Sequence, residues 1–234
     1  MPAERRLSTL VPAVLSAVLV PLAIGLIFWW VPDDADQGFS QRIFYFHVPV
    51  ALTTYACFAY GAVGAAMYLW RRDPVWDLRS YVGLHVGTIF GTLVLLTGPI
   101  WARISWGVWW NWSDQQLNVF LILFLFYCAY FMLRFSIEEG ERRAAYSAVY
   151  ALAGVALIPL SVIGVRIAQE LIHPQVFFSE GEVADMPGSF AATFLVAMLG
   201  MLCLAAAMIA VELRGKRAAL RVRELRRRLA GVDL

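Results

Sequence analysis

Long uncharged, apolar stretches alternate along the chain with short charged segments. Each stretch approaches or exceeds the ~20 apolar residues that a helix needs to cross the hydrocarbon core of a bilayer. Backbone amides in that environment must pair within the chain, which favours helices. The pattern predicts an all-α integral membrane protein with six transmembrane helices in the windows 7–32, 43–70, 80–102, 115–133, 144–165 and 186–211. The first window is too long for the ~7–15-residue apolar core of a signal peptide, so we interpret it as a retained helix.

The composition agrees with a membrane protein and argues against a soluble one. Hydrophobic residues make up 61% of the 234 residues, charged residues make up 15%, and the mean hydropathy is +0.67. Soluble domains average about 25% charged residues. A chain as apolar as this one would expose large apolar patches in water. The same numbers exclude a disordered or collagen-like chain.

Lys and Arg residues indicate how the chain is oriented. With six spans both termini share one side of the membrane, and sixteen of the 19 Lys and Arg residues fall on that side. The other side holds Arg42, Arg103 and Arg166. Because cytoplasmic loops carry the excess of basic residues, this distribution predicts cytoplasmic termini.

The basic residues also divide the chain into two parts. We expect a transmembrane domain over residues 1–213 and a basic cytoplasmic tail over residues 214–234, the latter a helix lying along the inner membrane surface. Attraction to anionic lipid explains the arginines of the tail more simply than binding to nucleic acid does. We therefore expect the tail to contact the lipid bilayer and not to bind nucleic acid.

A stripe of small residues runs along the third window. Gly83, Gly87 and Gly91 are spaced four residues apart. Such small-xxx-small stripes allow helix backbones to approach closely. The spacing predicts close helix packing on this face and indicates nothing about function.

The three histidines are the most informative residues for chemistry. His47 lies at the outer end of the second window and His173 in the last outer loop, so the topology places both at one membrane face. His85 lies near the cytoplasmic end of the third window, about a membrane thickness of ~30 Å from the other two. We expect His47 and His173 to share a site, and His85 to be an ordinary polar residue near the interface.

Five of the nine tryptophans gather within twelve residues between the third and fourth windows. An aromatic belt at headgroup level is the simpler explanation of membrane tryptophans, but a belt spreads them over many helix ends. The spacing of Trp106, Trp109 and Trp110 predicts a continuous aromatic face if this stretch is a short interfacial helix. Such a face would suit a flat, apolar ligand. The cluster consists of Trp101, Trp106, Trp109, Trp110 and Trp112.

Haem is the ligand that these features favour together. Two imidazoles can fill the axial positions of a haem iron, which assigns His47 and His173 as metal ligands. The tryptophans would lie against the porphyrin, and Arg42, Arg103 and Arg166 would pair with the propionates. The three cysteines form no C-x-x-C or C-x-x-C-H pattern, which excludes thiol–disulfide chemistry and covalent c-type haem.

Two other functions stay open at this point. A membrane oxidoreductase subunit would exchange electrons between b-type haem and quinone, but it would typically place haem ligands within facing helices. A transport permease would need ionisable groups within its spans, and no acidic residue lies in the middle of any window. The absence of the G-x-x-x-x-G-K-[ST] pattern also excludes ATP hydrolysis by a P-loop.

Two segments resemble a known family. GPIWARISWGVWWNWSD, residues 98–114, resembles the tryptophan-rich WWD signature of the cytochrome c assembly proteins. RIFYFHVP, residues 42–49, together with the six spans, resembles the heme exporter protein C branch. The resemblance runs across essentially the whole chain.

The resemblance implies a role in cytochrome c maturation in the plasma (inner) membrane, with the haem site facing the periplasm or cell exterior. Members of this family hold haem b noncovalently between two axial histidines, which match His47 and His173 here. They hand it to a membrane-anchored haem chaperone, and ABC transporter subunits help to release the loaded chaperone. On this basis the chain is a haem-binding and transfer protein and not an enzyme.

The signature departs from the family pattern at one position. The family usually reads W-G-x-W-W-x-W-D, whereas this chain has Ser113 in place of the aspartate and Asp114 one residue later. We expect Asp114 to reach the same partner through a shifted turn. The candidate haem-binding residues are therefore Asp114, Arg42 and Arg103 together with the five tryptophans.

Overall fold

The computed structural model describes residues 3–35, 37–160, 188–229 and 231. Six helices in this part of the chain are long and apolar enough to cross a membrane, the fifth of these spans being Glu141–Leu160. The described residues contain no β-strand. The prediction of an all-α protein with six spans is confirmed. The elements are α1 (Ala3–Trp29), η1 (Phe39–Ile43), α2 (Phe44–Arg71), α3 (Pro74–Trp106), α4 (Gln115–Ser136), α5 (Glu141–Ala153), η2 (Gly154–Ala156) and α7 (Gly188–Leu229).

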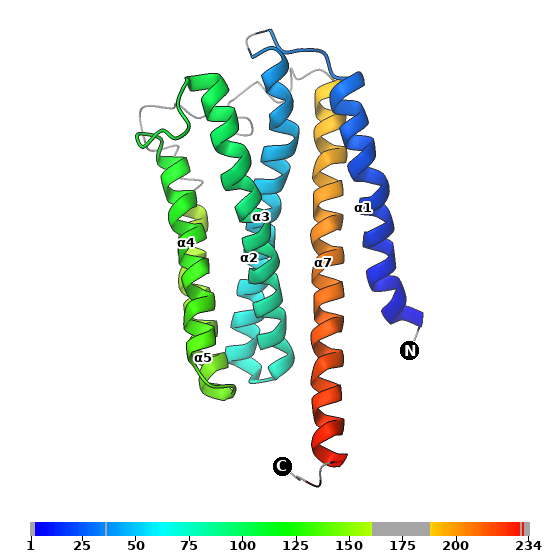
Figure 1. The fold of residues 1–234 in the computed structure, drawn as a ribbon, viewed down its shortest axis with the longest axis vertical. Helices are drawn as coiled ribbons and strands as arrows, with labels where there is room; N and C mark the ends of the chain where they lie inside the picture. The colour runs from blue at the N-terminus through cyan, green and yellow to red at the C-terminus, as the bar shows by residue number, and fades with distance from the viewer. Residues whose placement is uncertain (1–2, 36, 161–187, 230, 232–234) are drawn as a thin grey trace.

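The helices lie side by side in an elongated bundle (Figure 1). α2 and α3 run antiparallel at its centre, α1 packs along α7 on one side, and α4 and α5 lie on the other. α1 begins and α7 ends at one end of the bundle, which we call the terminal end. α1 and α3 end, and α2, α4 and α7 begin, at the opposite end, which we call the distal end. The cytoplasmic location of the terminal end stays a prediction.

α2 and α3 approach each other until their backbones touch. A Cβ atom on Gly64 would lie 2.7 Å from the backbone nitrogen of Ser80, and one on Gly83 would lie 2.9 Å from that of Gly61. Real Cβ atoms essentially never lie within 3.0 Å of such neighbours. A larger residue at either position would force the two helices apart, so the close packing predicted for the glycine stripe is confirmed at Gly83.

α7 is a single continuous helix of 42 residues, which corresponds to ~63 Å at 1.5 Å per residue. The tail was expected to be helical, and it is. Instead of turning across the end of the bundle, however, it continues along the axis of α7 beyond the terminal end (Figure 1). A terminal guanidinium nitrogen of Arg223, in this extension, lies 3.7 Å from a carboxylate oxygen of Glu139 in the turn between α4 and α5. The boundary expected at residue 213 falls within the helix, and the division into two parts stays a prediction.

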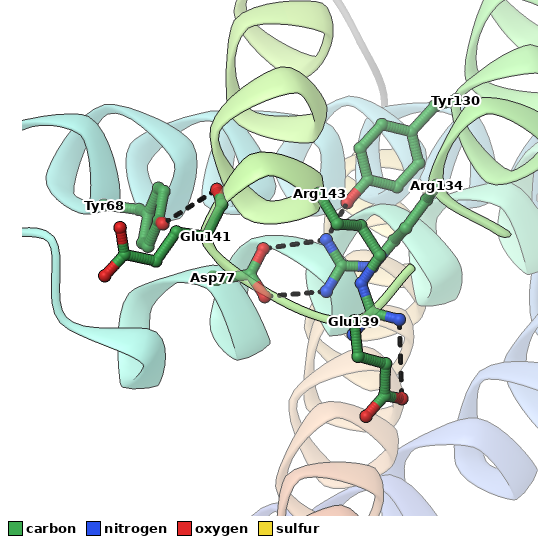
Figure 2. Close-up of polar contacts among 7 residues, drawn as sticks. All are labelled: Tyr68, Asp77, Tyr130, Arg134, Glu139, Glu141 and Arg143. Carbon is green, nitrogen blue, oxygen red and sulfur yellow. Dashed lines mark hydrogen bonds and ion pairs between the residues drawn. The ribbon is translucent and has the colours of Figure 1, made fainter. Parts of the chain in front are cut away.

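A buried ion pair joins α3 to α4 near the terminal end (Figure 2). The two terminal nitrogens of Arg134 each donate to one carboxylate oxygen of Asp77 at 2.7 Å. The side chains are only 7% and 16% exposed, respectively. Arg134 also donates to the hydroxyl of Tyr130 at 3.5 Å and lies 4.9 Å from the centre of the Tyr81 ring. The bidentate geometry and these extra contacts compensate for the loss of hydration of the two charges.

The turn between α4 and α5 is held by further polar contacts beside this pair (Figure 2). Glu139 pairs with Arg143 at 3.4 Å. The hydroxyl of Tyr68, on α2, donates to the backbone carbonyl of Glu141 at 3.4 Å. The terminal end is therefore tied together by side chains from four helices.

Aspartates begin α3 and α4. Asp73 accepts a hydrogen bond from the backbone N–H of Val75 at 2.8 Å, and Pro74 occupies the first helical position. Asp114 accepts from the backbone N–H of Leu117 at 3.1 Å and is only 4% exposed. Such N-caps satisfy one unpaired backbone donor and place negative charge at the positive end of the helix dipole. Asp114 thus sets the start of α4, a role that the sequence comparison with the WWD signature did not suggest.

Arg134→Met should lower the free energy of unfolding by about 3–5 kcal/mol, because it leaves the Asp77 carboxylate buried without its partner. The double variant Asp77→Leu/Arg134→Met should recover most of this loss, since both charges are then removed. Thermal unfolding in detergent, followed by circular dichroism, measures the difference. The control is Arg228→Met, which breaks an exposed pair with Glu224 and should cost little. Equal losses for Arg134→Met and Arg228→Met would contradict the assignment.

Asp114→Ala should lower the free energy of unfolding by about 1 kcal/mol, the usual cost of removing an N-cap. Asp114→Asn should remain close to the parent, because its side-chain oxygen can accept the same hydrogen bond. Unfolding in detergent tests both variants. If the Asn variant loses as much stability as the Ala variant, the carboxylate charge matters more than the cap.

Candidate functional site

The candidate residues that the structure describes all lie at the distal end. Arg42 belongs to η1 and His47 to the first turn of α2. Trp101, Arg103 and Trp106 belong to the last turns of α3. The remaining candidates follow α3 in the loop to α4, namely Trp109, Trp110, Trp112 and Asp114. The topology that placed His47 and the tryptophans on one face is therefore reproduced, whereas His173 and Arg166 lie outside the described residues.

His47 is held against the neighbouring helix. Its ring nitrogen Nδ1 lies 2.8 Å from the hydroxyl oxygen of Thr97 on α3. The ring also packs on Gly98, where an added Cβ would lie 3.2 Å from the Cε1 atom of His47. The imidazole is half-buried between α2 and α3, and its orientation is set by residues about 50 positions further along the chain.

The tryptophans do not form the continuous face that a short interfacial helix would have given. α3 ends at Trp106, where Gly107 adopts the left-handed conformation with φ of 75°. A glycine in this conformation commonly terminates a helix because it has no Cβ to clash with the backbone. Trp109 and Trp110 lie in the loop beyond it, so the short interfacial helix on which the continuous aromatic face depended does not form.

Two pairs of tryptophan rings replace that helical face. The rings of Trp101 and Trp106 meet edge to face with centroids 4.8 Å apart, and those of Trp110 and Trp112 lie 5.8 Å apart. Trp109 is 61% exposed and Trp112 is 72% exposed. The distal end therefore presents exposed aromatic rings in the loop after α3, whereas Trp101 and Trp106 at the end of α3 are partly buried.

Amide side chains support these rings, and the sequence analysis did not identify them. The indole N–H of Trp110 donates to the side-chain oxygen of Asn118 at 3.2 Å, and the amide nitrogen of Asn118 donates to the backbone carbonyl of Trp112 at 2.6 Å. The indole N–H of Trp101 donates to the side chain of Gln37 at 3.3 Å. The sequence signal that could have identified Asn118 is its polar side chain within an otherwise apolar window.

The two described cations of the site are already engaged. Arg42 pairs with Asp33 at 2.8 Å, donates to the backbone carbonyl of Phe28 at 3.3 Å and lies 4.6 Å from the centre of the Phe39 ring. Its Nε atom is buried and has no hydrogen-bond partner among the described residues. Arg103 is exposed and donates to the carbonyl of Gly107 at the end of its own helix.

His85 is separate from these residues. Its Nδ1 lies 2.8 Å from a carboxylate oxygen of Glu212 on α7, and its ring stacks on that of Tyr81. Twelve residues of α3 separate His85 from Thr97, a distance of ~18 Å along the helix axis. The separation is smaller than the membrane thickness that we expected, yet still far too large for a shared metal site.

No group of three or more His, Cys, Asp or Glu side chains gathers around a possible metal position within the described residues. A haem site does not need such a group of side chains, because the protein supplies only the axial ligands of the iron. His47 is the described imidazole that lies at the same end of the bundle as the tryptophans. The three cysteines carry free thiols, as expected for small side chains within helices.

Comparison with known proteins agrees with the WWD resemblance. The family model described as heme exporter protein C matches residues 3–228. Heme exporter protein C of Paracoccus denitrificans is 30% identical over 228 residues, which cover 95% of this chain and 94% of that protein. The protein of the same name from Bradyrhizobium diazoefficiens is 32% identical, over 95% of this chain and 82% of its own length. Heme exporter protein C of Escherichia coli K12 is 30% identical over 64% of this chain and 62% of its own length. The chain therefore belongs to the heme exporter protein C family.

Proposed function

We propose that this protein binds haem b noncovalently at the outer membrane face and transfers it to a haem chaperone during cytochrome c maturation. The family supports haem handling. The observation that carries the proposal for this chain is the position of His47, held by Thr97 at the same end of the bundle as the exposed tryptophans. The chain binds and passes on its cargo without breaking a bond in it, so its function is transfer and not catalysis.

Each part of the distal end has a role in this proposal. His47 and His173 are the axial ligands of the iron, since neutral imidazole is a common ligand of haem iron. The exposed rings of Trp109 and Trp112 supply apolar surface for a flat porphyrin, together with Trp101, Trp106 and Trp110. Asp114 contributes by fixing the loop at the start of α4.

The propionates of haem are negatively charged, so the proposed site needs cationic side chains to pair with them. Asp33, the ion-pair partner of Arg42, is 57% exposed. An incoming carboxylate can therefore replace it with little change in the buried surface. The Nε of Arg42 is buried without a described hydrogen-bond partner, so a carboxylate reaches it only when the side chain moves. Arg103, whose described contact is to its own helix end, can likewise turn to a carboxylate. Both residues therefore suit the role that the sequence assigned to them.

The same proposal identifies partners and location. The distal end faces the periplasm or cell exterior, because the terminal end carries most of the basic residues. There a membrane-anchored haem chaperone takes up the cargo, and ABC transporter subunits of the maturation system assist the release. An exposed aromatic loop keeps the cargo within reach of such a partner.

The rival function, electron exchange between b-type haem and quinone, finds little support. Such a subunit typically places haem ligands within facing helices, often in both halves of the membrane. The chain has three histidines, and His85, the one in the terminal half, is hydrogen-bonded to Glu212. A redox role would predict rapid reduction of the bound haem by quinol analogues, whereas transfer predicts loss of haem to an added chaperone domain.

His47→Ala and His173→Ala should each remove or alter the low-spin absorption spectrum of the haem-loaded protein, because each deletes one axial ligand. His85→Ala should leave the spectrum unchanged, since its ring pairs with Glu212 away from the distal end. Visible absorption of the purified full chain in mild detergent, with added haem where needed, measures this. Equal haem retention in all three variants would overturn the site assignment.

Trp109→Leu should weaken haem binding roughly threefold to tenfold without unfolding the bundle, because an aromatic contact contributes about 0.5–1.5 kcal/mol beyond its buried area. Trp109 lies outside the helices and is largely exposed. Trp110→Leu should weaken binding as well, with an added loss of stability from the hydrogen bond to Asn118. Haem titration gives the affinities. Trp70→Leu, at an exposed tryptophan of the terminal end, is the control and should bind like the parent.

A further inference from the structure

We propose that Thr97 is a positioning residue that sets the tautomer and orientation of His47, so that the Nε2 atom of His47 faces the haem iron. This inference rests on the proposed function, in which His47 is an axial ligand. It adds to that function a residue on a different helix, α3, which touches neither the iron nor the porphyrin in the proposal. It also explains why a glycine follows Thr97.

The position of one hydrogen atom decides the tautomer. The hydroxyl of Thr97 has a single hydrogen, and its oxygen lies 2.8 Å from the backbone carbonyl of Leu93 and 3.4 Å from that of Val94. A threonine hydroxyl in a helix donates to the carbonyl one turn earlier. With its hydrogen used there, the Thr97 oxygen can only accept at the 2.8 Å contact with Nδ1 of His47. Nδ1 therefore carries the proton of the neutral imidazole.

The other nitrogen follows from this assignment. A neutral imidazole has one protonated nitrogen and one with a lone pair, and the hydrogen bond of the first decides which nitrogen can bind a metal. Protonation at Nδ1 leaves the lone pair on Nε2. A hydrogen bond from the Nδ1 proton to an acceptor also raises the basicity of the ligand. The bond from Thr97 to the Leu93 carbonyl polarises its oxygen and makes it a better acceptor.

Gly98 provides the space for this arrangement. An added Cβ at Gly98 would lie 3.2 Å from Cε1 of His47 and 4.0 Å from both ring nitrogens. The Cε1 edge of the ring thus points at the backbone of α3, with Thr97 beside it. Because the hydrogen bond and the packing surface come from α3 while the ring comes from α2, the pairing of these two helices sets the direction of the imidazole.

Haem titration of the full chain, followed by absorption, tests the role of Thr97. Thr97→Val and Thr97→Ala remove the acceptor and should weaken haem binding roughly tenfold to a hundredfold, as loss of such an outer hydrogen bond does at metal sites. Thr97→Ser keeps the hydroxyl and should bind like the parent. Thr92 makes the same kind of bond to a carbonyl of its own helix, at 3.0 Å from that of Thr88, so Thr92→Val is the matched control and should have no effect.

A double-variant comparison separates positioning from general destabilisation. If Thr97 acts through His47, Thr97→Val should cause no further loss in a His47→Ala background, and its unfolding in detergent should match that of Thr92→Val. An equal loss of haem binding in both backgrounds, or parent-like binding by Thr97→Val and Thr97→Ala, would overturn the role of Thr97. The parent spectrum surviving in His47→Ala would overturn the proposed ligand itself, an outcome that is distinct from either of these.

Discussion

The backbone contact between α2 and α3 is the constraint on which the candidate site depends. Facing pairs such as Gly61 with Gly83 and Gly64 with Ser80 let the two helices approach more closely than side chains would allow. Without a hydrophobic driving force between helices in lipid, such close van der Waals packing is a main source of their association. At the distal end of the same pair of helices, the imidazole of one meets a hydroxyl of the other. The interface that holds the fold together therefore also orients the proposed haem ligand.

Two Arg–Asp pairs show how the ends of the bundle differ. Near the terminal end, Asp77 is 16% exposed and binds Arg134 through both oxygens. At the distal end, Asp33 is 57% exposed and binds Arg42 through one oxygen. Breaking the first pair leaves a buried charge, whereas the second can exchange its carboxylate for another with little change in burial. The terminal pair suits a structural role and the distal pair suits reversible binding of an acidic group.

The loop of residues 107–114, here called the tryptophan loop, has fixed ends and an exposed surface. Its start is fixed by the left-handed Gly107 after α3 and its end by the Asp114 cap of α4. Asn118 connects the loop to α4 through two hydrogen bonds. Trp109 and Trp112 nevertheless remain mostly exposed. In the proposed function this arrangement presents the cargo at the surface, where a chaperone can take it, without requiring the bundle to open.

The hydrophobic pattern by itself determined the number and type of the spans, because uncharged windows of this length satisfy their backbone in lipid only as helices. Counting spans then placed His47 and the tryptophans at one end. The point where α3 ends was not determined, since the spacing of Trp106, Trp109 and Trp110 fits a helix until the conformation of Gly107 is known. The sequence also could not identify Thr97 as the partner of His47, because 50 positions separate them. That contact depends on how far α2 and α3 are rotated about their own axes, and only the packing of the folded bundle decides this.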